Sequence, residues 1–375
     1  MVAGEASGDQ LGAHLIAALK ARRSPIRFAG IGGPKMTAEG FDAHYPIETL
    51  SVRGYAEVLG QYGRIMAMRR RIGNALLEER PDLFIGIDSS AFNLGLEQRL
   101  KDAGISAIHY VSPQIWAWRR WRLRKIARSV NHILVMFPFE APLYEKAGIP
   151  VTYVGHPLAD VIPMNPSKEA ARAELRLPRN KLIVALLPGS RRSELRYMAS
   201  AFVLAAHRFR QDFHDVHFVC PTVTRETREM FERTLHEQQR TDLPLTLLFG
   251  HSHEALAAAD LALVASGTAT LEAALFKTPM VITYRQSPIT WALMRPLLYL
   301  PYVGMPNVLA GEKLVPELLQ DEASPAALAD ALLKLANDRA AQRRQVERFH
   351  EFHERLRQNT AEKAAEAILR VLERR

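Results

Sequence analysis

Two short glycine-rich segments, about half the chain apart, constrain the fold of this sequence more than any other feature. The first reads Gly4-Glu5-Ala6-Ser7-Gly8-Asp9 and the second Leu187-Pro188-Gly189-Ser190-Arg191. Each follows an apolar run and opens a helical pattern, and the backbone amides at such a turn favour an anion. One glycine turn often only joins two elements. Two of them, each at the start of its own strand and helix series, predict two Rossmann-like halves that face a central cleft.

The apolar runs that follow these segments predict two parallel sheets. In the first half we expect strands at residues 27–31, 83–87, 107–111, 132–137 and 151–154. Helical patterns lie around them at 11–21, 61–79, 94–103 and 142–147. In the second half the expected strands are 182–187, 217–220, 245–249, 261–265 and 280–284. Near-continuous apolar strands separated by helices are typical of doubly wound α/β sheets that helices cover on both faces.

The chain of 375 residues is long enough for two domains, each with its own core. Pro157, Pro163 and Pro166 punctuate a linker, so we expect one domain over residues 1–160 and a second over 168–340. Residues 324–375 read as charged helices with a break near Asn337-Asp338, and we expect 341–375 to form a separate C-terminal helical segment. Because only three residues precede Gly4, either the chain begins several residues late or a short first strand suffices.

The composition indicates a globular protein, with 48% hydrophobic and 24% charged residues. No apolar run reaches the roughly 18 residues of a membrane span, and no basic segment followed by an apolar one opens the chain. Cys220 is the only cysteine, which excludes an intrachain disulfide. We therefore expect a protein of the reduced cytoplasm.

The net charge of +9 is unevenly distributed. Residues 116–128 contain six basic side chains and no acidic one, which favours an anionic partner such as nucleic acid, a lipid headgroup or a phosphorylated substrate. Three of the four tryptophans lie in the same stretch, so Trp116, Trp118 and Arg119 are candidates for a bilayer interface. Alternatively, these aromatic side chains only anchor a helix to the core.

The helical pattern at residues 61–77 is a second candidate for membrane contact. Ile65, Met66 and Ile72 fall on one side of it, with several arginines off that side. The alternative, a helix that packs on the sheet, is equally compatible with the pattern.

Asp88 is the candidate catalytic residue because it ends the apolar run at residues 83–87. A carboxylate at the carboxyl end of a parallel strand opens toward the crevice where such sheets bind ligands. There it can remove a proton from an attacking hydroxyl. A helix cap or turn residue is the alternative interpretation.

Two further turns carry groups suited to a phosphorylated ligand. Ser190 and Arg191 combine a hydroxyl and backbone amides with a cation that can bind phosphate through two hydrogen bonds. After the expected strand 261–265, Ser266 and Thr268 can cradle phosphate, and Glu272 can accept hydrogen bonds from sugar hydroxyls. No Asp-x-Asp pair follows a strand and no His/Cys cluster has ligand spacing, so we expect neither a metal nor another cofactor.

Together these segments resemble one family closely, the lipid-A-disaccharide synthases, which are inverting glycosyltransferases of the GT-B fold. The resemblance rests on both glycine segments, on residues 108–113 with Trp116-Ala117-Trp118, and on residues 265–272. It extends through Asn307-Val308-Leu309-Ala310-Gly311 and residues 315–320, in the expected order over nearly the whole chain. Joint matches of this length are highly specific.

The resemblance implies transfer of 2,3-diacylglucosamine from UDP to the 6-hydroxyl of 2,3-diacylglucosamine 1-phosphate, in lipid A biosynthesis. It implies an acceptor-side first domain and a second domain that binds the UDP-sugar. Asp88 would be the general base, Gln320 would lie in the site and Ser7 near the reacting sugars. The UDP moiety would be bound by Ser190, Arg191, Glu272 and Asn307.

The same resemblance implies peripheral association with the anionic inner membrane from the cytoplasmic side, and no nucleic-acid partner. It also implies that residues 341–375 pack back on the first domain or are exchanged in a homodimer.

One departure from the family pattern follows Asp88, where Ser89-Ser90-Ala91 replaces the usual Ala-Pro-Asp and removes a carboxylate. The enzymatic alternative is another GT-B protein that acts on UDP-N-acetylglucosamine, a 2-epimerase or the transferase of peptidoglycan synthesis. The non-enzymatic alternative is a basic module that binds nucleic acid or membranes through Arg119–Arg128.

Overall fold

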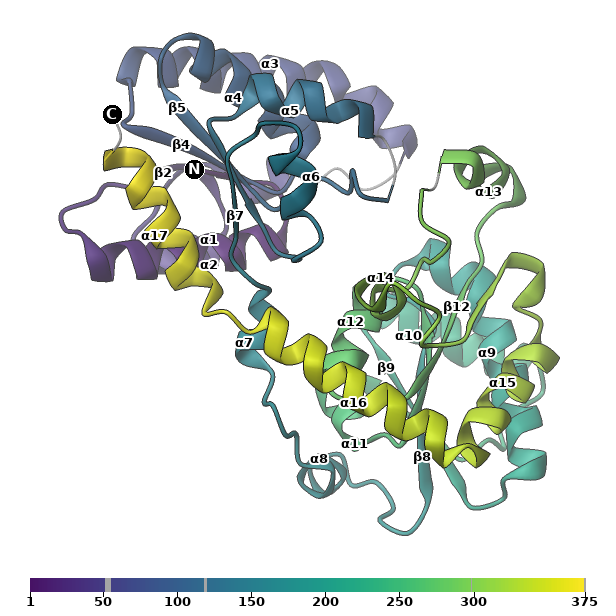
Figure 1. The fold of residues 1–375 in the computed structure, drawn as a ribbon. Coiled ribbons are helices and arrows are strands. Elements are labelled where there is room, and N and C mark those ends of the chain that lie inside the picture. Colours follow the sequence, from purple (N-terminus) through teal and green to yellow (C-terminus); the bar gives the residue numbers. More distant parts are fainter. Residues whose placement is uncertain (51–54, 118–119, 298, 374–375) are drawn as a thin grey trace. The chain divides into compact units, whose positions relative to one another are not determined.

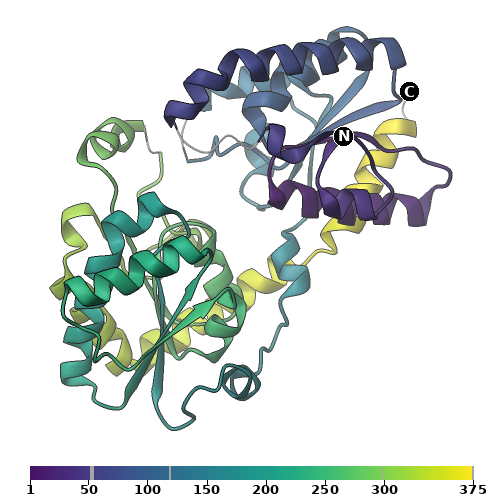
Figure 2. The same ribbon diagram turned by 180° about the vertical axis from the view of Figure 1, so that it is seen from behind.

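The computed structural model describes residues 1–50, 55–117, 120–297 and 299–373. Two compact units make up the chain: residues 1–160 with 355–375, and residues 161–354. Each unit is a parallel sheet with helices on both faces (Figures 1 and 2). This confirms the prediction of two Rossmann-like, doubly wound domains.

The first unit has a seven-stranded sheet in the order β3-β2-β1-β4-β5-β6-β7. Its strands are β1 (Val2–Ala3), β2 (Ala29–Gly32), β3 (Asp42–Pro46), β4 (Leu83–Ile87), β5 (Ser106–Tyr110), β6 (His132–Val135) and β7 (Val151–Tyr153). Its helices are α1 (Ala6–Arg22), α2 (Pro34–Ala38), α3 (Tyr55–Glu79), α4 (Ser90–Asp102), α5 (Leu123–Ser129), α6 (Ala141–Glu145) and α17 (Thr360–Glu373), and α7 (Pro157–Val161) ends the unit.

Successive side chains of each strand point to opposite faces of the sheet, and both faces are buried. In β4, Phe84 packs in the layer formed by α3 and α4. Its neighbours Ile85 and Ile87 pack in the layer formed by α1 and α17. Strand β4 is therefore apolar throughout, which is why the sequence located it correctly.

The second unit has a six-stranded sheet in the order β10-β9-β8-β11-β12-β13. Its strands are β8 (Leu182–Leu187), β9 (Val216–Thr222), β10 (Leu245–Phe249), β11 (Leu261–Ala265), β12 (Met280–Tyr284) and β13 (Glu317–Leu319). Its helices are α8 (Lys168–Glu174), α9 (Arg192–Asp212), α10 (Arg225–Glu237), α11 (Ser252–Ala258), α12 (Thr268–Leu275), α13 (Pro288–Met294), α14 (Met305–Ala310), α15 (Pro325–Asn337) and α16 (Arg339–Leu356).

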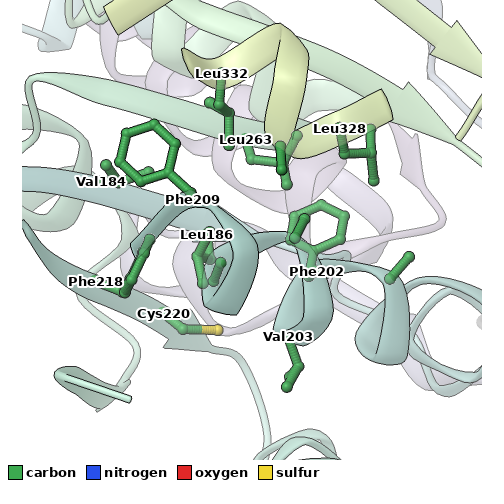
Figure 3. Packing of buried hydrophobic residues seen from close by; sticks show 14 of the residues in the cluster. Val184, Leu186, Phe202, Val203, Phe209, Phe218, Cys220, Leu263, Leu328 and Leu332 are labelled. Carbon is green, nitrogen blue, oxygen red and sulfur yellow. The ribbon is translucent and has the colours of Figure 1, made fainter. Parts of the chain in front are cut away.

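The core of the second unit lies between its sheet and the helices α9 and α15 (Figure 3). Phe202 and Phe209 of α9 pack there against Leu328 and Leu332 of α15. Cys220 lies in the same cluster, and burial raises the pKa of its thiol. The lone cysteine is thus a small buried hydrophobic residue, as its sequence context predicts.

The C-terminal helices divide between the two units, whereas the sequence placed residues 341–375 in one segment. Helix α16 packs on the second unit, where the Gln345 side chain accepts the Met280 N–H at the start of β12. Helix α17 returns to the first unit and packs against α1. The Asp160 carboxylate caps α17 by accepting the backbone N–H groups of residues 358, 359 and 360 at 3.1, 3.0 and 2.7 Å.

None of the helices within the described ranges is both long enough and apolar enough to cross a membrane.

Candidate active site

In the first unit, the sheet changes winding direction between β1 and β4. These two strands are paired, with Val2 opposite Gly86, while β2 lies on the other side of β1 and β5 on the other side of β4. Loops from neighbouring strands diverge at such a point, and open α/β sheets bind ligands there. The Gly4 turn follows β1 and Asp88 follows β4, so the structure brings both predicted segments to this point.

The turn after β4 has an unusual backbone. Asp88 and Ser89 have φ values of 51° and 41°, so two consecutive non-glycine residues are left-handed. The Asp88 N–H donates to the Tyr110 carbonyl at 2.8 Å, and its carbonyl accepts from Asn93 Nδ2 at 2.9 Å. Such strained residues persist only where their surroundings hold them. The Asp88 carboxylate itself is half-buried and has no hydrogen-bond partner within the described residues.

Gly4 is required by the close approach of these two turns. A Cβ at Gly4 would lie 2.0 Å from the Ser89 Oγ. Ser7, the other predicted residue of this segment, is exposed in the first turn of α1. Asp9 has a structural role that the motif did not reveal: its buried carboxylate accepts the N–H groups of Gly33, Lys35 and Met36 and so caps α2.

A buried polar network lies beneath Asp88, between β5 and α4. His109 Nδ1 and Glu97 Oε1 are 2.7 Å apart, and both side chains are fully buried. Burial raises the pKa of Glu97, and the nearby imidazole opposes that shift. The position of His109 in the expected strand 107–111 did not reveal this partner. Of the two ring nitrogens of His109, only Nδ1 has a hydrogen-bond partner. His109 Nε2, Glu97 Oε2 and Asn93 Oδ1 have none in the described part of the chain.

Glu140 is a second buried acid near the ends of β5 and β6. Its carboxylate accepts the Phe137 N–H at 2.9 Å and hydrogen bonds from the side chains of Ser112 and Trp116. Burial outweighs these bonds and raises its pKa from 4.5 to about 7. Trp116 also packs edge-on against Phe139, with ring centroids 5.3 Å apart. The structure thus shows Trp116 as an anchor of this loop. Trp118 and Arg119 lie outside the described residues.

The predicted membrane-facing side of α3 is partly buried in the protein. Ile72 is 6% exposed and lies in the cluster with Phe84, and Ile65 packs against the same cluster. Met66 is half-buried. Ile72 therefore packs on the sheet, whereas membrane contact by the half-buried Ile65 and Met66 stays a prediction.

In the second unit, four neighbouring strands bring the predicted donor-binding residues to one edge. Strand β8 pairs with β11, β11 with β12, and β12 with β13, all in parallel. The carboxyl ends of parallel strands share one edge. The turn at Ser190 and Arg191 follows β8, Ser266 and Thr268 follow β11, and Gln320 follows β13.

The turn after β8 is organised by Glu194. Its Oε2 accepts the N–H groups of Ser190 and Arg191 at 2.9 and 3.2 Å, and its Oε1 lies 3.3 Å from an Arg191 guanidinium nitrogen. The sequence predicted these amides as anion ligands, but the capping carboxylate already occupies them. Arg191 keeps a side chain that is 78% exposed at the amino end of α9.

The turn after β11 carries two predicted hydroxyl groups, one of which is hydrogen-bonded inside the protein while the other belongs to an exposed residue. Ser266 Oγ donates to the Val303 carbonyl at 3.0 Å, whereas Thr268 is exposed in the first turn of α12. Glu272, on the same helix, is half-buried, and one of its carboxylate oxygens lies 3.8 Å from His253 Nε2. Burial raises the pKa of Glu272, and His253 opposes the shift.

Asn307 is fully buried, which corrects its predicted contact with UDP. Its Nδ2 donates to the Val315 carbonyl and to Glu317 Oε1, each at 2.8 Å, and its Oδ1 accepts the Val315 N–H at 2.8 Å. Glu317, which sequence reasoning missed, also accepts the N–H groups of Val303 and Gly304. This pair therefore holds α14 against β13. Gln320, with φ 52°, keeps an Nε2 that lacks a partner among the described residues.

Two other features of the second unit contain none of the predicted donor residues. A cavity of about 290 Å³ is lined by residues of α7, α8 and α11, including His253, and by Phe276 just after α12. On the surface, the side chains of Glu174, His251 and Glu254 offer ligand atoms within 4.8 Å of one another and could hold a metal ion.

Comparison with known proteins identifies the family. The family model of lipid-A-disaccharide synthetase matches residues 1–371. The chain belongs to the lipid-A-disaccharide synthase family. The synthase of Dechloromonas aromatica is 56% identical over 373 residues, covering 99% of this chain and 98% of the relative. That of Pseudomonas aeruginosa is 49% identical over 375 residues, covering 100% and 98%. The resemblance noted from the sequence motifs is thereby confirmed.

Solved structures agree with the fold of this synthase. The calicheamicin glycosyltransferase CalG4 superimposes with a TM-score of 0.60 at 16% identity, covering 99% of this chain and 96% of that chain. At such low identity the likeness concerns the fold alone, and it confirms the GT-B architecture.

Proposed function

We propose that this enzyme transfers 2,3-diacylglucosamine from UDP to the 6-hydroxyl of 2,3-diacylglucosamine 1-phosphate. The products are a β-linked lipid A disaccharide 1-phosphate and UDP. The observation that carries the proposal is Asp88: in a chain of this family, a carboxylate with no partner among the described residues stands at the winding reversal of the first sheet.

Asp88 acts as the general base. Its carboxylate takes the proton of the 6-hydroxyl while that oxygen attacks the anomeric carbon of the donor sugar. The bond from the anomeric carbon to the UDP oxygen breaks on the opposite side, which inverts the configuration. The hydrogen bonds to Tyr110 and Asn93 fix the backbone of Asp88 and leave both carboxylate oxygens for the substrate.

The second unit binds the UDP moiety. Arg191 meets the diphosphate, because its exposed guanidinium is held by Glu194 at the amino end of α9. Ser190 and Thr268 supply exposed hydroxyls, and Glu272 supplies a carboxylate for sugar hydroxyls. Gln320 supplies an amide nitrogen that has no partner among the described residues. Asn307 and Ser266 shape the site from behind through their internal hydrogen bonds.

The acyl chains of both substrates place the reaction at a membrane. We propose that the enzyme works on the anionic cytoplasmic surface of the inner membrane, without spanning it, and forms a homodimer. The exposed Trp121, in the basic stretch after Trp116, is available for such contact in the first unit.

The test incubates the protein with both acylated sugars and follows UDP release and disaccharide formation. Wild type should form both products in equal amounts, and Asp88→Asn should form both at least about 100-fold more slowly while it still binds UDP. Equal turnover of unacylated UDP-N-acetylglucosamine would favour another GT-B enzyme. Steeply salt-dependent binding to DNA or RNA without UDP release would contradict an enzymatic role.

A further inference from the structure

The strongest surface feature outside the proposed site is the segment that follows β12. Helix α13 and the short 3-10 turn Arg295–Leu297 continue each other, and α13 stands away from the sheet of its own unit (Figures 1 and 2). Ile289, Leu293 and Leu297 are 76%, 68% and 47% exposed. Tyr299, just beyond the turn, is 47% exposed. These four side chains are almost half of the large hydrophobic residues that the described part of the chain exposes.

The spacing of these residues makes them one surface. Ile289, Leu293 and Leu297 follow one another at intervals of four residues, so they lie on the same side of the helical stretch. The other strongly exposed hydrophobic residues of this unit, Val161, Val223 and Phe249, come from separate elements. Hydrophobic residues scattered singly over a surface are ordinary, whereas a contiguous patch marks an interaction site.

The charge around the patch selects its partner. Between Glu272 and Glu312 the sequence has no acidic residue, and Arg285 and Arg295 flank α13. An apolar stripe with arginines beside it and no carboxylate suits an interface of acyl chains and anionic headgroups. A rim that is basic throughout this segment favours a uniformly anionic surface over a protein partner, whose interface would present groups of both signs.

We propose that residues 285–297 together with Tyr299, here named the α13 surface, dock the enzyme on an anionic lipid bilayer. The apolar stripe enters the boundary between headgroups and acyl chains, and Arg285 and Arg295 contact lipid phosphates. This inference rests on the proposed function, which requires two lipid substrates, and it names the contact surface. It is separate from the predicted contact of α3, of which Ile72 packs inside.

The experiment measures co-sedimentation of the full chain with vesicles of phosphatidylcholine that contain about 30% phosphatidylglycerol. Replacing Ile289, Leu293 and Leu297 together by serine should weaken binding on the order of 100-fold, because each loses its insertion into the interface. The matched control replaces Val161, Val223 and Phe249 by serine and should bind as wild type does. Thermal unfolding of both triple variants verifies that they are folded.

A second arm tests the charge. Arg285→Gln with Arg295→Gln should weaken binding to the anionic vesicles about tenfold or more, as expected when two basic side chains near the surface are lost. Binding to pure phosphatidylcholine should be little affected. Wild type that binds neutral and anionic vesicles equally, or binds neither, overturns the proposal. The proposal is also overturned if the serine triple variant of the α13 surface binds vesicles as wild type does, or if the control triple variant loses as much vesicle binding.

Turnover of detergent-dispersed substrates separates this inference from the proposed function. The serine triple variant should keep that turnover, since no residue of the proposed site is changed. Wild type without turnover in detergent would contradict the function while the vesicle result stands. Wild type with turnover but without vesicle binding would contradict the α13 surface alone.

Discussion

The turn after β4 in the first unit and the turn after β8 in the second each follow a strand that borders the winding reversal of its sheet, but the two turns have opposite chemistry. After β4, Asp88 and Ser89 are both left-handed, and α4 begins without a side-chain cap among the described residues and without an acidic residue in its first turn. After β8, Gly189 takes the positive φ of 120°, and Glu194 caps the turn. One turn exposes a carboxylate and the other a guanidinium.

The difference shows where the chemistry of such a fold originates. A Rossmann-like unit places several turns at the edge formed by the carboxyl ends of its strands. The residues of these turns decide whether that edge accepts a proton or binds an anion. In the second unit the Glu194 cap satisfies the backbone amides, so the charge left exposed for a ligand is the Arg191 guanidinium. In the first unit a strained backbone holds the carboxylate, and the free charge is the acid.

The sharpest test of this contrast is Asp88→Asn. Asparagine tolerates the left-handed backbone and removes only the base. We expect kcat to fall by about 10²–10⁴-fold with UDP affinity unchanged. Steady-state kinetics and calorimetric titration with UDP measure the two effects. Asp82→Asn, an exposed change at the start of the same strand, serves as the control, and equal loss in both variants would remove Asp88 from the mechanism.

Glu140→Gln tests whether the first unit holds a buried acid that titrates near neutrality. Its folded-state pKa of about 7 exceeds the usual 4.5, so the folded protein binds the extra proton between these values. The contribution of Glu140 to stability therefore falls as pH rises from 4.5 to 7 and stays level above 7. Relative to the glutamine variant, wild type should lose about 3 kcal/mol over this window.

Thermal unfolding of both proteins at pH 5 and pH 8 checks that difference. Glu145→Gln, an exposed change on the neighbouring helix α6, should follow wild type. A stability gap between wild type and Glu140→Gln that is the same at both pH values would contradict the raised pKa.

Arg191→Gln tests the other side of the comparison. Loss of a charge-assisted hydrogen bond to phosphate costs about 1.5–3 kcal/mol, so UDP should bind about 10- to 150-fold more weakly, and turnover should fall with it. Arg192→Gln is the matched control, because the neighbouring Arg192 is exposed and pairs with Glu226 at 3.0 Å. If the Arg192 variant lost as much UDP affinity, general charge rather than the position of Arg191 would be responsible.

The smallest effect is expected from Ala91→Asp, which gives α4 the first-turn acid that α9 already has. A carboxylate near a helix amino terminus stabilises by about 0.3–1 kcal/mol at an exposed position. The thermal midpoint should rise slightly, and Ala91→Asn should not reproduce the rise. A change of more than tenfold in kcat would show instead that the carboxylate missing from this chain takes part in the reaction.

The apolar runs predicted much of the fold. Strands β4, β8, β10, β11 and β12 begin and end at the residues expected from the sequence. All but one of them are buried almost throughout, so nearly every residue in the run is apolar. The sequence missed β3, which is mostly exposed, and β13, which has three residues. Such edge strands carry little hydrophobic pattern.

From the sequence, only those residues of the candidate site that directly follow a strand could be placed. Asp88, Arg191 and Gln320 follow strands, so their place at a sheet edge is a local property of the sequence. The role of Asn307 is not local, because it depends on Glu317 and Val315, which the fold brings to the same side chain. The sequence also leaves undetermined whether the apolar side of an amphipathic helix faces the core or the solvent, as α3 and the α13 surface show.

The sequence by itself determined the two parallel α/β units, the family and the turns that carry charge, because these follow from periodicity and short-range motifs. Only the tertiary structure decided which polar groups are free for a ligand. The carboxylates of Glu194 and Glu317 accept hydrogen bonds from groups inside the protein, whereas the Asp88 carboxylate has no hydrogen-bond partner within the described residues. The physical reason is that a hydrogen bond needs its partner within about 3 Å, and residues distant in sequence reach that separation only when the chain has folded.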